Sequence, residues 1–181
     1  MVKESADRLL LDHMQLLRGL DRSLPVLDLA CGNGRNGLAL AAAGLPLLFA
    51  DQSTSALETV EQRLSEADLP GRTWQIDLEQ PGTNPLAGKR FAAIVVFRYL
   101  HRPLFPAIRD AVVPGGIVVY ETFTIEQRRF GRPNNPDFLL QPGELEANFR
   151  GWERIYYFEG IGTDPDRGIA QIVARKPGGT A

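Results

Sequence analysis

The stretch that decides the fold class is residues 26–37, which read VLDLACGNGRNG. Residues 26–30 form a short apolar run that contains one acid, and the run ends where the glycines begin. Residues 38–43 then have the composition of a helix, which Gly44 ends. A strand, a glycine-rich turn and a helix in this order predict the first unit of an α/β sheet with a ligand at the turn.

The alternation of strands and helices continues along the chain. Apolar runs predict further strands at 47–50, 73–76, 91–97, 117–120, 152–158 and 169–174. The last two are joined by a short loop and predict an antiparallel hairpin at one edge. Helical spacing predicts a helix that ends near residue 67 and another at 103–113, and residues 114–116 predict a turn. This order is typical of a doubly wound, mostly parallel sheet with helices on both faces. Because the run 91–97 is apolar throughout, we expect it at the sheet centre.

Both ends of the chain and one insertion give further expectations. Residues 1–22 predict an N-terminal docking helix, with Ser5 as its N-cap. Residues 124–143 are polar, contain prolines and show no sustained period, which indicates an ordered lid. Residues 177–181 are expected to form a frayed tail. No linker divides the chain, so residues 1–181 are predicted to form a single domain.

Composition argues against several classes of protein. The chain has 20 Lys and Arg against 22 Asp and Glu, a net charge of −2, whereas nucleic-acid-binding proteins usually carry a basic excess. One cysteine and two histidines do not supply a disulfide framework or a multi-cysteine zinc site, so we expect no metal. No apolar run is long enough for a membrane span and the start lacks a signal peptide. The expected location is the cytoplasm.

The glycine turn leaves two ligands to be distinguished. Residues 32–37 match the pattern G-x-G-x-x-G, which between a strand and a helix favours NAD. Asp28 argues against NAD, because a dinucleotide-binding strand would place an apolar side chain there and a buried carboxylate needs a partner. An acid just before a turn that approaches its ligand suits a cationic amino-acid group. This arrangement favours S-adenosylmethionine.

The sequence resembles the class I S-adenosylmethionine-dependent methyltransferases, whose first motif is echoed by residues 26–35. Within that class it is similar to the tellurite-resistance methyltransferase group through CGNGRN at 31–36, PGEL at 142–145 and GWER at 151–154. The resemblance covers nearly the whole chain and implies a seven-stranded sheet with an antiparallel last strand. The chain differs at Ala30, where many members have Gly, and in the loop 160–167, which lacks that group's histidine. Ala still allows a close approach of the backbone if its φ stays negative.

The resemblance implies a set of residues for S-adenosylmethionine and its product, S-adenosylhomocysteine. Asp51, at the end of the second strand, falls where the family places an acid on the ribose hydroxyls. Asp77 matches the position that meets the adenine amino group, and Phe97 and Arg98 would flank the methionine portion and the adenine. The expected cofactor-binding residues are Asp28, Ala30, Cys31, Gly32, Asn33, Gly34, Arg35, Asn36, Asp51, Gln52, Ser53, Asp77, Leu78, Phe97 and Arg98.

A small-molecule acceptor is favoured over a nucleic-acid base. Enzymes that methylate base amino groups resemble one another in an Asn/Asp-Pro-Pro-aromatic motif after the fourth strand, whereas residues 97–100 read FRYL. His101 is the histidine placed to act as a general base, and the alternative is that it caps or packs at a turn. An NAD-binding oxidoreductase and a non-catalytic cofactor-binding module of the same fold remain the alternative functions. The expected substrate-binding residues are Tyr99, Glu121, Phe130, Arg132 and Arg167.

Overall fold

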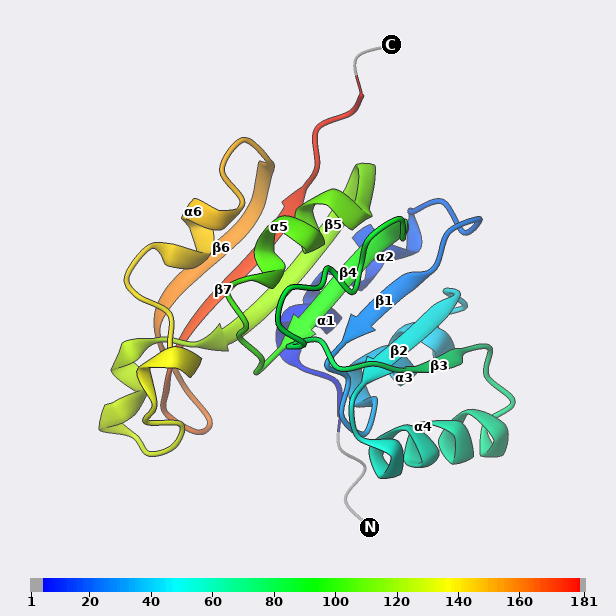
Figure 1. The fold of residues 1–181 in the computed structure, drawn as a ribbon, viewed down its shortest axis with the longest axis horizontal. Coiled ribbons are helices and arrows are strands. Elements are labelled where there is room, and N and C mark those ends of the chain that lie inside the picture. Colours follow the sequence, from blue (N-terminus) through cyan, green and yellow to red (C-terminus); the bar gives the residue numbers. More distant parts are fainter. Residues whose placement is uncertain (1–4, 180–181) are drawn as a thin grey trace.

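The computed structural model describes residues 5–179 and contains a seven-stranded sheet (Figure 1). The strands are β1 (Val26–Leu29), β2 (Leu47–Asp51), β3 (Arg72–Gln75), β4 (Phe91–Phe97), β5 (Val112–Phe123), β6 (Glu153–Gly162) and β7 (Arg167–Arg175). Their order across the sheet is β3-β2-β1-β4-β5-β7-β6. The first five run parallel, and β7 pairs antiparallel with both β5 and β6. The central position of β4 and the antiparallel hairpin at one edge are confirmed.

Helices cover both faces of the sheet. They are α1 (Arg8–Asp12), α2 (Met14–Arg18), α3 (Arg35–Ala42), α4 (Thr54–Glu66), α5 (Leu104–Ala111) and α6 (Glu144–Asn148). The four helices α1, α2, α3 and α4 pack on one face of the sheet in one buried cluster. Helices α5 and α6 pack on the opposite face of the sheet in a second cluster. The doubly wound α/β architecture is therefore confirmed, and Figure 1 shows α5 in front of the sheet.

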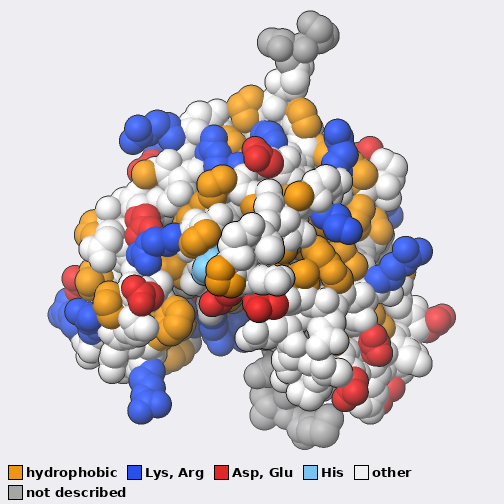
Figure 2. Space-filling model, viewed as in Figure 1, with side chains coloured by type: hydrophobic (Ala, Val, Ile, Leu, Met, Phe, Trp, Pro, Cys, Tyr) orange, Lys and Arg blue, Asp and Glu red, His pale blue; other side chains and the backbone are white. Residues whose placement is uncertain are grey.

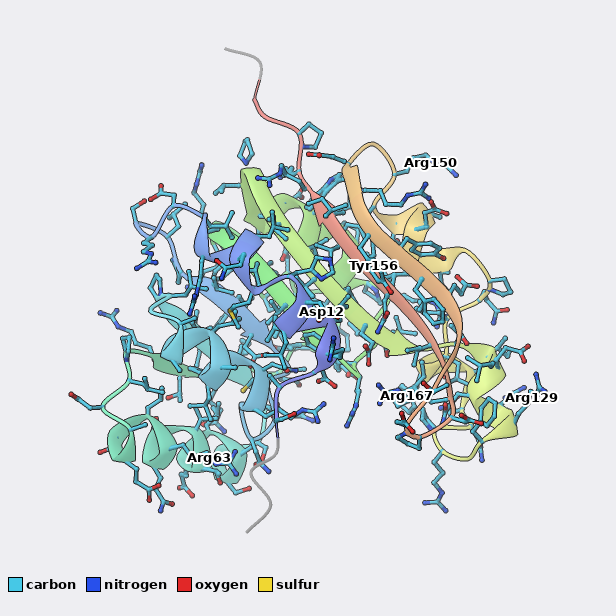
Figure 3. All side chains as sticks on the ribbon, turned by 180° about the vertical axis from the view of Figure 1, so that it is seen from behind. Asp12, Arg63, Arg129, Arg150, Tyr156 and Arg167 are labelled. Carbon is cyan, nitrogen blue, oxygen red and sulfur yellow. The ribbon has the colours of Figure 1, made fainter. Side chains whose placement is uncertain are left out.

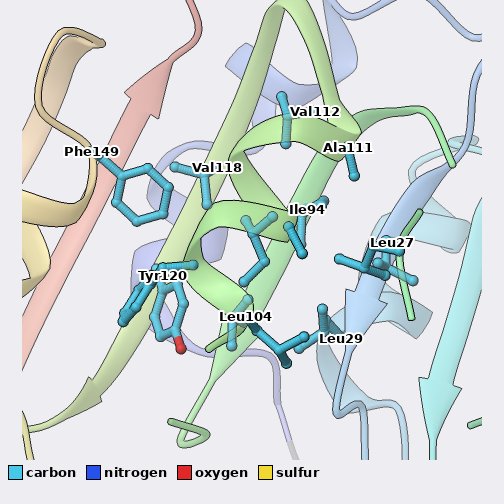
Figure 4. Close-up of a cluster of buried hydrophobic side chains, with 14 of the residues drawn as sticks. Leu27, Leu29, Ile94, Leu104, Ala111, Val112, Val118, Tyr120 and Phe149 are labelled. Atoms are coloured by element: carbon cyan, nitrogen blue, oxygen red, sulfur yellow. The ribbon is translucent and has the colours of Figure 1, made fainter. Parts of the chain in front are cut away.

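The central strand shows why the sheet has two cores. All seven residues of β4 are buried. Because side chains alternate along a strand, Ala93 and Val95 belong to the α1–α4 cluster while Ile94 and Val96 belong to the α5–α6 cluster. Figure 4 shows the second cluster, with Ile94 beside residues of α5 and β5. Each fully buried Val or Ile contributes about 1.5–3 kcal/mol relative to an exposed one, so β4 anchors both layers.

The N-terminal helix differs from its prediction. It is broken at His13 into α1 and α2, and its N-cap is Asp7 rather than Ser5. At the break the ring Nδ1 of His13 lies 2.8 Å from the carbonyl oxygen of Leu9, and the His13 N–H bonds to Leu10 O at 3.2 Å. The side chain thus bonds to a helix carbonyl at this point. Residues 1–4 of the predicted segment lie outside the described residues.

Two further elements depart from the sequence-based picture. The turn predicted at 114–116 lies within β5, where the register against β4 shifts between Phe91 and Ala93 and forms a bulge. Helix α6 was not predicted, although its first two residues, Glu144 and Leu145, are the last two of the PGEL motif. It is only five residues long, and a short helix leaves little periodicity to detect.

The segment 124–143, which the sequence predicts to be a lid or an insertion, has little regular secondary structure. It contains the 3-10 helices η1 (Ile125–Arg129) and η2 (Pro136–Phe138), and Thr124 forms a bridge with Leu140. The buried side chain of Gln127 accepts from the Gly168 N–H at 3.0 Å and donates to the Arg132 carbonyl at 3.0 Å. The segment is therefore tied to β7. Residues 177–179 of the predicted tail carry no secondary structure, and 180–181 lie outside the described residues.

Candidate functional site

The carboxyl ends of the parallel strands border a pocket of about 240 Å³. Ligands of open α/β sheets bind at this edge, near the point where the strand order reverses. Here the reversal falls between β1 and β4. Figure 2 shows a notch at the lower edge of the molecule, between the segment 124–143 and the side that carries α4. The pocket residues are Ala30, Asp51, Gln52, Ile76, Asp77, Leu78, Glu79, Arg98 and Tyr99.

Asp51 holds the glycine turn in place. One carboxylate oxygen accepts from the Gly32 N–H at 2.8 Å, and the other accepts from the Ser53 N–H at 2.9 Å. Gly32 has φ +52°, and a Cβ added there would meet no atom within 4 Å. The turn therefore presents bare backbone to open space beside the pocket.

Asp28 lies beneath the turn rather than in the pocket. Its side chain is buried, and Oδ2 accepts from the Gly37 N–H in the first turn of α3 at 2.8 Å. Burial raises the pKa of Asp28 to about 7, and the hydrogen bond from Gly37 opposes that rise. A Cβ at Gly37 would lie 2.7 Å from this carboxylate and 2.3 Å from the Phe49 ring. The last glycine of the pattern thus allows α3 to pack closely on β1 and β2.

Ala30 does not meet the condition under which alanine is a mild replacement for glycine. That condition is a negative φ, whereas Ala30 has φ +55°. A positive φ also occurs on the other side of the strand reversal, where Arg98, the residue after β4, has φ +57°. Left-handed backbone is rare for residues other than glycine and clusters at functional sites. Both residues border the pocket.

Asp7 was not predicted as a site residue, yet it lies at this edge. Its carboxylate is 2.5 Å from Arg35 Nη2 and 3.5 Å from Arg98 Nη2, and it accepts from Asn36 Nδ2 at 2.9 Å. The Asp7 N–H in turn donates to Asn36 Oδ1 at 2.8 Å. In the sequence an acid before a helix predicts an N-cap, so that pattern gives no indication of these long-range contacts.

The other predicted cofactor residues are divided between the pocket and its surroundings. Gln52, Asp77 and Leu78 line the pocket. Phe97 and Gly34 are buried, Cys31 is partly buried, and Asn33 is exposed with its carbonyl accepting from Arg63. Ser53 caps α4 by accepting from the Ala56 N–H at 3.3 Å.

Predicted acceptor residues meet at the end of β5. Glu121 is buried, lies 3.7 Å from the Arg167 guanidinium and accepts from Gln171 Nε2 at 2.5 Å. The Arg167 Nε is buried without a hydrogen-bond partner among the described residues. Figure 3 shows Arg167 beside the segment that carries Arg129. Phe130 and Arg132, on the same segment, are exposed.

Tyr99 and His101 lie in different places. Tyr99 lines the pocket, its hydroxyl is buried without a partner in the described part of the chain, and burial raises its pKa. His101 lines a second hollow of about 360 Å³, between residues 78–85 and α5. Its backbone carbonyl accepts from the Leu104 N–H at 3.0 Å, but its side chain does not cap α5, whose N-cap is Pro103. The role of His101 as a base stays a prediction.

Comparisons with known proteins give a family match and one curated relative. Residues 26–116 match the family described as "Methyltransferase domain". The chain is 29% identical over 167 residues to Hemagglutinin 1 of Eikenella corrodens, covering 84% of this chain and 54% of that protein. It therefore spans about half the length of this curated relative.

Two solved structures illustrate the shared fold. TehB from Haemophilus influenzae aligns with a TM-score of 0.77 and 21% identity, over 92% of this chain and 61% of that one. An S-adenosylmethionine-dependent methyltransferase from Clostridium acetobutylicum aligns with a TM-score of 0.68 and 11% identity, over 93% of this chain and 90% of that one.

None of the helices within residues 5–179 has the length and apolar character that a membrane span requires.

Proposed function

Because the chain belongs to the methyltransferase domain family, we propose that it is an S-adenosylmethionine-dependent enzyme that methylates a small-molecule acceptor by in-line transfer. The observation that carries this proposal is the pocket at the strand reversal, bordered by the bare turn at Gly32 and by the Asp51 carboxylate. When bound, S-adenosylmethionine supplies a methyl group activated on a sulfonium.

The pocket residues fit such a cofactor. A carboxylate at the end of β2 suits two vicinal hydroxyls, because charge-assisted hydrogen bonds are stronger than neutral ones. Asp51 is that residue, and Asp77 and Leu78 lie in the same pocket where an adenine would be read. Tyr99 and Glu79 also line the pocket, and burial together with the Glu79 carboxylate raises the pKa of Tyr99, so these two side chains are further polar groups that a ligand would meet there.

The protein's part in methyl transfer is alignment and exclusion of water. Positive charge leaves sulfur as the bond to the methyl group breaks, so few side chains need to move a proton. Glu121, Arg167 and the segment 124–143 flank the end of β5 on the acceptor side. The unpaired Arg167 Nε supports an acceptor with an anionic group, with Phe130 and Arg132 contributed by the segment.

Asp51→Ala tests the cofactor part of the proposal. We expect S-adenosylhomocysteine binding to weaken by about 1.5–3 kcal/mol, the cost of losing hydrogen bonds to a charged group. The control is Asp21→Ala, because the exposed Asp21 also accepts from a backbone N–H two residues later, at Ser23. Titration calorimetry on both folded variants gives the answer. An Asp51→Ala affinity equal to that of Asp21→Ala would remove Asp51 from the site.

Turnover on a panel of acceptors tests the substrate part. Release of S-adenosylhomocysteine is followed with small thiols, amines, carboxylates and oxyanions, and with a structured RNA as comparison. We expect activity on a small anionic acceptor, and a raised KM with little change in kcat for Arg167→Gln. Activity on the RNA alone would overturn the small-molecule proposal. No methyl transfer to any acceptor, despite binding, would favour the non-catalytic alternative.

A further inference from the structure

Asp7 occupies the N-cap position of α1 without capping it. No hydrogen bond joins its carboxylate to the first turn of α1, although aspartate at this position usually makes one. The side chain is turned instead toward α3 and the end of β4, and it is only 6% exposed. A buried carboxylate that leaves its own helix uncapped is held by its long-range partners.

Those partners lie at the start of α3 and directly after β4, on the two sides of the strand reversal, and Arg98 is the one that lines the pocket. Arg35 is the first residue of α3, directly after the glycine turn, and donates to the Asp7 carboxylate. Asn36 also donates to that carboxylate, and its side-chain oxygen accepts from the Asp7 N–H. Arg98 follows β4 in left-handed conformation and lines the pocket. One carboxylate thus connects the N-terminal segment to both sides of the strand reversal. Figure 3 shows α1, which carries Asp12, lying across the sheet from behind.

The two arginine contacts of Asp7 differ in distance and exposure. The Arg98 side chain is 42% exposed and lies 3.5 Å from Asp7, whereas Arg35 is 21% exposed and lies 2.5 Å away. Asp7 is therefore tightly bound to the start of α3 and loosely bound to the pocket wall, and the looser contact is the one that can respond to a ligand.

We propose that Asp7 is a positioning residue for the cofactor, which holds residues 5–12 against the start of α3, directly after the glycine turn, and holds Arg98 at the pocket wall. This inference rests on the proposed function, because it requires that the pocket binds S-adenosylmethionine. Cofactor binding and closure of the N-terminal segment are then coupled, so each stabilises the other. Asp7 itself does not line the pocket.

The decisive experiment compares Asp7→Asn with Asp12→Asn. Asp12 is the matched control, because it is an exposed acid on the same helix, bonded to Arg8. By calorimetry we expect Asp7→Asn to raise the Kd for S-adenosylhomocysteine about tenfold, and Asp12→Asn to leave it unchanged. Asp7→Glu, which keeps the charge, should recover part of the loss. A folded Asp7→Asn protein with a Kd within about twofold of wild type would overturn the inference.

Hydrogen exchange separates positioning from a purely structural role. In the wild type, saturating S-adenosylhomocysteine should slow exchange at the amides of α1 by about tenfold, and this response should disappear in Asp7→Asn. Equal slowing in both proteins would contradict the coupling. If Asp7→Asn does not fold, Arg98→Gln serves instead and should also abolish the response. A wild-type protein that fails to bind S-adenosylhomocysteine would refute the proposed function itself.

Discussion

Asp28 gives the stability of this protein a predictable dependence on pH. Its pKa is about 7 in the folded protein because of burial, against an ordinary value of 3.8. Between these values the folded state holds a proton that the unfolded state has released, so the free energy of unfolding falls as pH rises from about 4 to about 7. Above pH 7 the buried carboxylate is charged, which costs on the order of a few kcal/mol.

Asp28→Asn removes this titration and keeps an oxygen that can accept from Gly37. Urea unfolding at pH 5 and pH 8 should show the variant gaining stability relative to wild type at the higher pH, by on the order of a few kcal/mol. Taking the difference between the two proteins cancels the contributions of every group that they share. A difference that stays constant with pH would show that Asp28 is ionised throughout this range.

Ala30→Gly should not carry the usual cost of introducing glycine. Ala30 has φ +55°, where a residue with a Cβ is strained. Relief of about 1 kcal/mol of strain offsets the entropy that glycine adds to the unfolded chain. We expect thermal unfolding within about 0.5 kcal/mol of wild type, or more stable, whereas Ala39→Gly inside α3 should lose about 1 kcal/mol. Equal losses for both variants would refute this account.

At the level of residues, the sequence predicted which buried polar groups require a hydrogen-bond partner better than it predicted backbone conformation. That Asp28 requires a partner follows from its place in an apolar strand, and Gly37 supplies one. The sign of φ at Ala30 is set by the path between β1 and the turn, which no single residue type reveals. The contacts of Asp7 span 28 and 91 residues of sequence, so local patterns could not predict them.

Gln127 is the side chain that ties the segment 124–143 to β7. It accepts from the buried Gly168 N–H and donates to the Arg132 carbonyl. Gln127→Ala leaves that N–H without its acceptor, so we expect a loss of about 1–3 kcal/mol and faster proteolysis within the segment. Arg128→Ala, at an exposed neighbour, is the control. Unchanged proteolysis in Gln127→Ala would mean that other contacts fix the segment.

Elements with strong periodicity or continuous burial were predicted, and short or interrupted ones were not. The boundaries of β4 were predicted at 91–97 and are found there, because every residue is apolar. The first helix was predicted as one piece, since nothing in the sequence shows that the His13 ring would contact the Leu9 carbonyl. The bulge in β5 looked like a turn because proline and glycine occur in both.

At the scale of the whole molecule, ligand binding should raise the melting temperature selectively. At 100 times its Kd, a ligand that binds only the folded state adds about 2.7 kcal/mol of stability. For a chain of 181 residues this corresponds to roughly 5–10 °C. We expect this shift with S-adenosylmethionine and S-adenosylhomocysteine and none with NAD. A shift with NAD alone would support the oxidoreductase alternative.

The architecture was predictable because a sheet with a buried core on each face produces a simple pattern of apolar residues in the sequence. Strands buried on both faces appear as continuous apolar runs, and the helices between them alternate with these runs. The acceptor region was less predictable. Glu121, Gln127 and Arg167 come together only through the antiparallel pairing of β7 with β5, which the sequence suggests but whose register it does not specify.

The position of β7 between β5 and β6 has a consequence for synthesis of the chain. Strand β6 leaves the ribosome first, yet it pairs with β7 and has no direct neighbour in β5. Until residues 167–175 emerge, the edge of β5 stays open and β6 cannot join the sheet. An open edge invites pairing with another nascent chain. Chains truncated before Ile169 should therefore aggregate, whereas the chain that includes all of β7 should fold into a protease-resistant domain.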